Sequence, residues 1–159
     1  MQGITPFLWF VDNAEEAARF YVSIFKDSKL VSNTRVKDTP SGVDTYVIEL
    51  MLHGTRFLLF NGGKAPGFDQ FSPATSFVLQ CKTQKEIDYY WGRLLRGGKS
   101  MQCGWLTDKY GIAWQVIPTF LPKLLNNPKN KEGSARATQA MLKMVKLDIQ
   151  KLKDAYSGK

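Results

Sequence analysis

The sequence is poor in the residues that build metal centres and disulfide frameworks. Its 159 residues include two cysteines, Cys81 and Cys103, and a single histidine, His53. Zinc and iron sites take three or four imidazole, thiolate or carboxylate ligands, so these three side chains make a poor set. Two separated cysteines also argue against a disulfide scaffold and fit a reducing compartment. We therefore expect no metal and no cofactor.

Long apolar runs are missing as well. No segment approaches the roughly 20 apolar residues that span a membrane. The N-terminus, Met1-Gln-Gly-Ile-Thr, lacks the basic start and apolar stretch of a signal peptide. These absences predict a cytoplasmic protein with no membrane partner.

Positive charge is in excess, and it is concentrated at one end of the chain. Residues 119–159 hold nine Lys or Arg and three Asp or Glu, whereas residues 1–118 hold thirteen and eleven. A basic tail can bind nucleic acid or acidic surfaces. Its lysines lack interleaved aromatic residues, and its only arginine is Arg136. A solvated helical face is the favoured interpretation, and a nucleic-acid partner is not expected.

The chain contains an internal repeat. The segment Thr5–Tyr21 has the pattern of a strand, a cap and a helix, and Ser76–Trp91 has the same pattern 71 positions later. Short strands are predicted after each helix, with His53-Gly54 as a tight hairpin turn in the first half. The repeat predicts an α+β fold of two paired βαβββ modules.

Local signals divide the chain further. We predict halves at about 1–63 and 74–118, joined by a Gly-, Pro- and Phe-rich loop that is a lid or a crossover. The predicted strands are Ile4–Val11, Leu30–Val36, Thr45–Leu52, Thr55–Phe60, Ala74–Cys81, Ser100–Leu106 and Ile112–Ile117. Capping boxes are predicted at Asn13 with Glu16 and at Thr83 with Glu86.

A basic helical extension, 119–159, is predicted after the body 1–118. It should hold a helical turn at Phe120–Leu125, a helix at Ser134–Val145 and a last helix capped by Asp148. Ala137, Ala140, Met141 and Met144 form an apolar stripe on the middle helix. That stripe covers either the protein's own sheet or a partner subunit, and the sequence leaves the two open.

Several motifs occur in a familiar order. They are Ile4-Thr-Pro-x-Leu-Trp-Phe10, Ala14-Glu-Glu-Ala-Ala-x-Phe-Tyr21, Phe60-Asn-Gly-Gly63, Gln102-Cys-Gly-Trp-Leu106, Asp108-Lys-Tyr-Gly111, Trp114-Gln-Val-Ile-Pro118 and Ala140-Met-Leu-Lys-Met144. With them the chain resembles the glyoxalase/bleomycin-resistance, or vicinal oxygen chelate, superfamily. The similarity is strongest to its PhnB-like branch, which is often labelled 3-demethylubiquinone-9 3-methyltransferase. The resemblance implies the glyoxalase-like fold and pairing of the halves across a homodimer.

Metal-dependent members of this superfamily place a ligand on the first and last strand of each half. The resemblance carries those positions to Thr5, Leu58, Ser76 and Gln115. Two hydroxyls, a hydrocarbon and a neutral amide do not compensate a divalent cation for its lost hydration shell. Metal-dependent glyoxalase or dioxygenase chemistry is therefore not expected.

Some side chains remain as candidate site residues. Those expected at a cavity or its rim are Trp9, Asn61, Cys103, Trp105, Trp114 and Gln115. Core packing is an equal interpretation for Trp9 and Trp114. The catalytic candidates are Cys103 and Glu49. For Cys103 a structural role is favoured, because no base or cation is predicted beside its thiol. Glu49 would be a candidate base only if it is buried.

The methyltransferase label is not supported by a cofactor motif in the sequence. Common methyltransferases place a Gly-rich turn between a strand and a helix, whereas Gly62-Gly63 is followed by a Pro- and Phe-rich loop.

The leading hypothesis for the function is a metal-independent protein that binds a small aromatic or apolar molecule. The second is an enzyme acting on a quinone-like or aromatic substrate, and the third is binding of nucleic acid or a regulatory partner through the tail.

Overall fold

The chain folds into two compact units, Met1–Asp69 and Gln70–Lys159. The structure, a computed structural model, describes residues 3–37, 45–64, 66–67 and 71–159. The predicted lid or crossover loop lies partly outside these residues. Among the described helices, none has the length and apolarity to cross a membrane.

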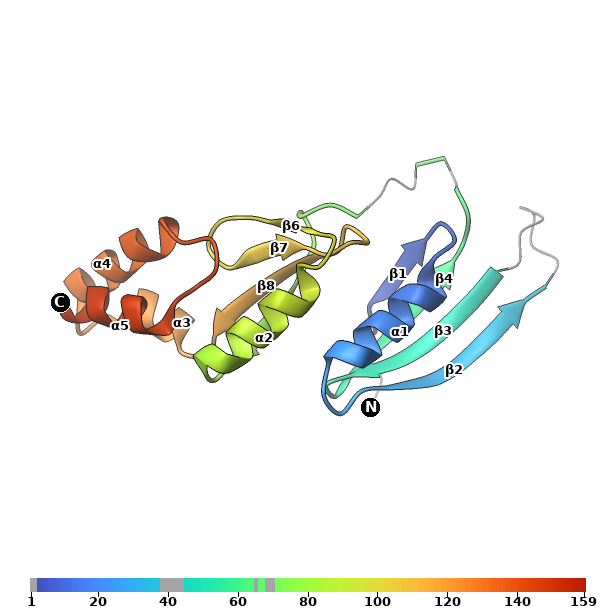
Figure 1. Ribbon diagram of the computed structural model, residues 1–159, viewed down its shortest axis with the longest axis horizontal. Helices are drawn as coiled ribbons and strands as arrows, with labels where there is room; N and C mark the ends of the chain where they lie inside the picture. The colour runs from blue at the N-terminus through green and yellow to red at the C-terminus, as the bar shows by residue number, and fades with distance from the viewer. Residues whose placement is uncertain (1–2, 38–44, 65, 68–70) are drawn as a thin grey trace. The chain divides into compact units, whose positions relative to one another are not determined.

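The first unit is one βαβββ module. Its elements are β1 (Phe7–Phe10), α1 (Ala14–Ile24), β2 (Lys29–Val36), β3 (Thr45–Leu52) and β4 (Thr55–Asn61). The strands form a sheet in the order β1-β4-β3-β2, with β1 parallel to β4 and the other pairs antiparallel (Figure 1). As predicted, His53 and Gly54 form a two-residue turn between β3 and β4, and both have positive φ angles of 48° and 81°. Such angles are those of the turn type that hairpins favour.

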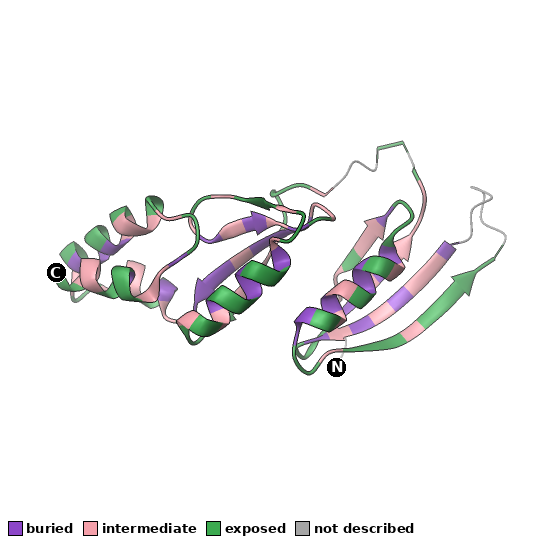
Figure 2. Cartoon of the chain, viewed as in Figure 1, coloured by how far each residue is buried: buried purple, intermediate pink, exposed green. Residues whose placement is uncertain are grey.

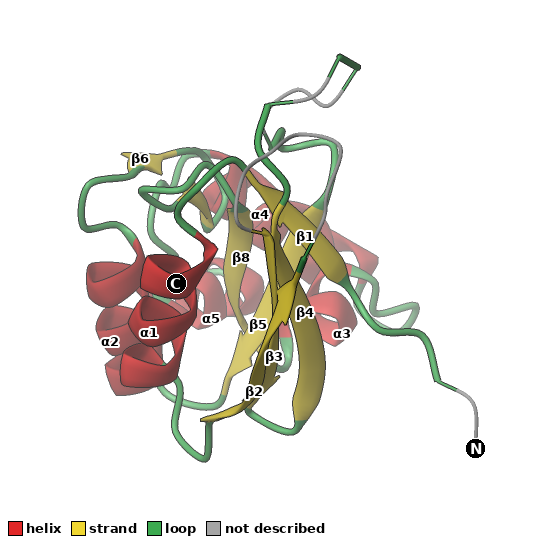
Figure 3. Cartoon of the chain, turned by 90° about the vertical axis from the view of Figure 1, so that its right-hand side faces the viewer, coloured by secondary structure: helices red, strands yellow, loops and turns green. Residues whose placement is uncertain are grey.

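One face of this sheet is covered and the other is open. Along β3 the residues Ile48, Leu50 and Leu52 are buried, and they alternate with less buried residues. Because successive side chains of a strand point to opposite faces, these three lie on the face that α1 covers. Helix and sheet form two layers (Figure 3), and the inner side of α1 is buried while β2 is almost entirely exposed (Figure 2). The residues between them, such as Glu49, point to the open face.

The second unit begins with a second module of the same topology. Its elements are β5 (Ser76–Cys81), α2 (Gln84–Leu94), β6 (Lys99–Ser100), β7 (Trp105–Thr107) and β8 (Ala113–Pro118). The strand order is β5-β8-β7-β6, and β5 is parallel to β8. The predicted α+β fold of paired βαβββ modules is thereby confirmed.

Two local predictions are wrong. The predicted strand Ser100–Leu106 is broken, because the chain leaves the sheet after Ser100 and turns through Cys103 and Gly104, whose φ angles are 60° and 82°. The predicted capping box at Asn13 does not form, since the Asn13 side chain makes no cap hydrogen bond. The Ala14 N–H at that helix end instead donates to Oδ1 of Asn61, 2.7 Å away on β4.

The helix in the second module is capped as predicted. The Glu86 N–H donates to Oγ1 of Thr83, and the Thr83 N–H donates to the Glu86 carboxylate. Local sequence spacing therefore specified the cap of α2 but not that of α1.

Three short helices complete the second unit: α3 (Leu121–Leu125), α4 (Lys131–Leu142) and α5 (Ile149–Ser157). Asp148 caps α5 as predicted, whereas α4 begins three residues earlier than predicted, behind Asn130. Leu121, Leu147 and Leu152 form a buried cluster with Ile117 of β8, and Met141 and Met144 pack against it. The apolar stripe of the tail thus packs on the end of the protein's own sheet. The boundary at residue 118 between body and extension stays a prediction.

Candidate functional site

The positions that the resemblance assigns to metal ligands lie at or near the parallel strand pair of each unit. In the first unit, the Leu58 N–H donates to the carbonyl of Pro6, the neighbour of Thr5, at 2.9 Å. In the second, Nε2 of Gln115 donates to Oγ of Ser76 at 2.9 Å. The described residues contain no group of three or more His, Cys, Asp or Glu side chains that could hold a metal ion. The donors at these four positions do not fit a divalent cation.

Gln115 is partly buried and lies on the face of the second sheet opposite to that of Trp114. It is directly opposite Trp105 of β7 and Val78 of β5. Its carboxamide oxygen has no hydrogen-bond partner within the described part of the chain. Gln115 therefore presents a free acceptor beside the Trp105 ring.

Trp114 lies on the opposite face, because neighbouring residues of a strand point in opposite directions. Its side chain is 5% exposed. Its indole N–H donates to Oδ2 of the buried Asp108 at 2.9 Å. The other carboxylate oxygen of Asp108 accepts from the backbone N–H groups of Tyr110 and Ile112. Asp108 thus forms an Asx-type turn and also holds the Trp114 ring in place.

A hollow of about 810 Å³ opens beside Trp105. It is lined by Pro73, Ser100, Met101, Gln102, Cys103, Trp105 and Val145. None of these side chains is charged. The structure brings the predicted residues Cys103 and Trp105 to one hollow and places Gln115 next to Trp105. Val145 was missed, because nothing in its local sequence indicates that the tail returns to this sheet.

The other predicted residues belong to the first unit. The Trp9 indole N–H donates to the carbonyl of Gly63 at 2.9 Å, and its ring packs edge-on against Phe60 with a centroid distance of 4.8 Å. Phe60 also packs against Phe7, which is 51% exposed. These three rings form an aromatic row on the open face of the first sheet. The Asn61 side chain accepts a hydrogen bond from the Ala14 N–H at the start of α1.

Glu49 lies on that same open face. Its carboxylate forms an ion pair with Nε of Arg56 at 2.8 Å, and its side chain is 22% exposed. It is opposite Leu58 in the register of β3 and β4. The Glu49 carboxylate is therefore partly exposed and paired with a cation.

The comparisons with known proteins agree with this architecture. Residues 2–117 match the sequence model of the family described as 3-demethylubiquinone-9 3-methyltransferase. The PhnB protein of Bacillus cereus, described by that same activity, is 34% identical, with a TM-score of 0.65 over 74% of this chain and 98% of that chain. The chain belongs to this family.

More distant solved structures share the fold alone. Protein PA1353 of Pseudomonas aeruginosa is 20% identical, with a TM-score of 0.61 over 74% of this chain and 98% of its own. The fosfomycin resistance protein FosX of Listeria monocytogenes, solved with Mn(II) and sulfate, is 14% identical, with a TM-score of 0.51 over 72% of this chain and 89% of its own. No curated protein matches the chain. This PhnB-like chain thus has the vicinal oxygen chelate fold.

The methyl donor implied by the family's description does not fit the residues of this PhnB-like chain. Its Gly62-Gly63 pair follows β4, and the next element described after it is the strand β5 rather than a helix. Common methyltransferases hold their methyl donor at a Gly-rich turn between a strand and a helix. No step of a methyl transfer is therefore derived from this site.

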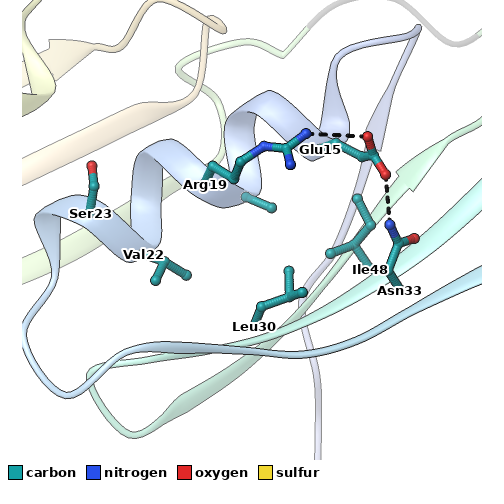
Figure 4. A pocket seen from close by; sticks show the side chains of 8 residues that line it. Glu15, Arg19, Val22, Ser23, Leu30, Asn33 and Ile48 are labelled. Carbon is teal, nitrogen blue, oxygen red and sulfur yellow. Dashed lines mark hydrogen bonds and ion pairs between the residues drawn. The ribbon is translucent and has the colours of Figure 1, made fainter.

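A second hollow, of about 270 Å³, lies in the first unit between α1 and β2 (Figure 4). Apolar side chains, including Val22, Leu30 and Ile48, line it. At its rim the Glu15 carboxylate accepts from Asn33 at 2.6 Å and from Arg19 at 3.4 Å. None of the predicted site residues lines this hollow, which lies on the helix side of the sheet.

Proposed function

We propose that this PhnB-like protein binds a small, uncharged aromatic or apolar molecule, without a metal, in the hollow beside Trp105. The observation that carries the proposal is the lining of that hollow. A space of about 810 Å³ with no charged side chain lies beside an indole ring. The hollow is broad and open to solvent, its volume lies in the range of small-molecule pockets, and Ser100 and Gln102 supply polar groups in its lining.

The polar groups are at hand next to the indole ring. The free carboxamide oxygen of Gln115 can accept a hydrogen bond from a ligand hydroxyl, and the Ser76 hydroxyl holds the amide in place. An uncharged aromatic alcohol would stack on Trp105 in the hollow and direct its hydroxyl toward Gln115, which is opposite Trp105 in the sheet and lies outside the hollow's lining. The resemblance assigns the positions of Ser76 and Gln115 to metal ligands in metal-dependent relatives, and in this proposal Gln115 offers a hydrogen-bond acceptor there instead.

The experiment is a calorimetric titration with 1-naphthol in the presence of EDTA. We expect saturable binding by the wild-type protein and binding about 3- to 10-fold weaker for Trp105→Ala, since an aromatic pair contributes about 0.5–1.5 kcal/mol. Tyr89→Ala is the matched control, because Tyr89 is an exposed aromatic residue on α2 of the same unit. It should bind as the wild type does.

Absence of 1-naphthol binding by the wild type in the presence of EDTA would refute the proposal. Equal weakening by both substitutions would also refute it, because the hollow would then not be the site. Catalysis through Cys103 or Glu49, ligand contacts at Trp9, Asn61 or Trp114, and the homodimer stay predictions.

A further inference from the structure

The C-terminal tail returns to the second sheet at the point where its strand is broken. The Cys103 N–H donates to the carbonyl of Met144, and the Gly104 N–H donates to the carbonyl of Val145, both at 2.7 Å. Figure 1 shows the link between α4 and α5 beside the connection from β6 to β7. The tail therefore supplies backbone acceptors that a regular strand would otherwise provide.

The close approach of the tail requires glycine at position 104. A Cβ there would lie 2.9 Å from the carbonyl oxygen of Val116 and 3.0 Å from Cγ of Leu147, and the φ angle is 82°. Both the positive φ and the lack of space exclude an ordinary side chain. Gly104 is thus packed between β8 on one side and the tail on the other.

Two further contacts hold the tail in this position. Leu147 is fully buried in the cluster formed with Ile117 and Leu152. The Gln84 side chain of α2 donates to the Leu147 carbonyl at 3.2 Å and accepts from the Ile149 N–H at 2.9 Å. Residues 144–149 are consequently fixed to both the sheet and the helix of the second module.

Val145 lies in the middle of this fixed segment. It is 40% exposed, although it lies between the packed residues Met144 and Leu147, and it lines the same hollow as Trp105 and Cys103. An apolar side chain that is held by its backbone and left open to a hollow is suited to contact a ligand. The family match ends at residue 117, so this contact lies outside the part that the family model covers.

We infer that the tail forms one wall of the ligand hollow and that Val145 sets the size of the aromatic molecule it admits. This inference rests on the proposed function, because it concerns the same hollow. It makes the 119–159 segment a specificity-determining part of the site in this protein. The tail's role is then to shape the hollow as well as to stabilise the fold.

The test measures the affinities for 1-naphthol and for phenol, which share the hydroxyl but differ by one ring. For Val145→Trp, a larger side chain in the wall should weaken 1-naphthol binding about 10-fold and change phenol binding by less than about 3-fold. Val145→Ala should weaken 1-naphthol binding about 2- to 4-fold through lost apolar contact. Leu142→Trp is the matched control, because Leu142 is a 51% exposed apolar residue of the same tail and does not line the hollow. Its ratio of affinities should equal that of the wild type.

The outcomes separate the two proposals. If the wild type binds 1-naphthol and Val145→Trp leaves the ratio of the 1-naphthol and phenol affinities unchanged, the role of Val145 in the wall is refuted while the proposed function stands. If the wild type binds neither probe, both are refuted. Cooperative thermal unfolding checks that each variant is folded, and Val145→Met replaces Val145→Trp if the latter is not.

Discussion

The two modules share one topology but differ in how completely their sheets are built. In the first, β2, β3 and β4 have eight, eight and seven residues, whereas β6 and β7 of the second have two and three. In the shorter sheet, the backbone N–H groups of Cys103 and Gly104 have no strand partner, and they donate instead to carbonyls of the tail. A repeated module can thus lose strand length where another segment satisfies its backbone, and here that segment borders a hollow.

The largest expected effect tests whether the tail is part of the second module. Leu147→Ala removes a fully buried side chain from the cluster below β8, and we expect it to lower the free energy of unfolding by about 2–5 kcal/mol. Leu142→Ala, at a 51% exposed position of the same tail, should change that free energy by less than about 0.5 kcal/mol. Urea unfolding followed by circular dichroism measures both. Equal effects would show that the tail is an appendage with no share in the core.

A smaller effect compares the helix caps of the two modules. Thr83→Ala removes a local cap and Asn61→Ala removes one supplied from another strand, and each should cost about 0.5–2 kcal/mol of unfolding free energy. Asn61→Asp keeps the acceptor and adds a negative charge at the helix N-terminus, so it should retain most of the stability. The same urea measurement applies. If Asn61→Ala has no effect while Thr83→Ala does, the cross-strand contact is not a cap.

The smallest effect is a difference in reactivity between two thiols of the second unit, and it involves no change in stability at pH 8. Cys81 lies on the regular strand β5, whereas Cys103 lies where the predicted strand is broken. Burial, followed by the nearby Glu86 carboxylate, raises the pKa of the Cys81 thiol from 9.0 to about 12. Because the thiolate is the nucleophile, iodoacetamide at pH 8 should modify Cys103, which is partly exposed, and leave Cys81 unmodified in the folded protein. Peptide mass spectrometry reads the two sites separately. Comparable rates of modification at both would contradict the burial of Cys81.

The raised pKa also has a defined consequence at alkaline pH. The folded protein retains the Cys81 proton between pH 9.0 and about 12, where the unfolded chain loses it. Stability therefore falls as pH rises through this range, and Cys81→Ala should remove that part of the decline.

Much of the fold could be predicted from local patterns. The turn at His53-Gly54, the cap at Thr83 and the strand β3 each depend on residues adjacent in sequence, and each prediction is confirmed. The cap of α1 could not be predicted in this way, because Asn61 lies 47 residues from Ala14. Sequence spacing shows only the partners that lie within a few residues of one another.

The candidate site divides along the same line. Trp114 and Gln115 were both expected at the cavity, yet adjacent residues in a strand cannot share a face. Their identities were visible in the sequence, but the face that α2 covers was not. The contact of Trp114 with its buried partner Asp108 could not be predicted from local spacing, because Oδ2 of Asp108 accepts from the Trp114 indole across the hairpin.

The sequence by itself determined the repeated topology, because it follows from residue types and local periodicity. Only the tertiary structure decided which strand face is open, which residue caps α1, and that Val145 reaches the hollow beside Trp105. These features depend on contacts between residues far apart in the chain. Buried backbone groups need hydrogen-bond partners and apolar side chains need to be removed from water, and the residues that meet these needs can be distant in sequence. Local sequence patterns therefore do not predict them.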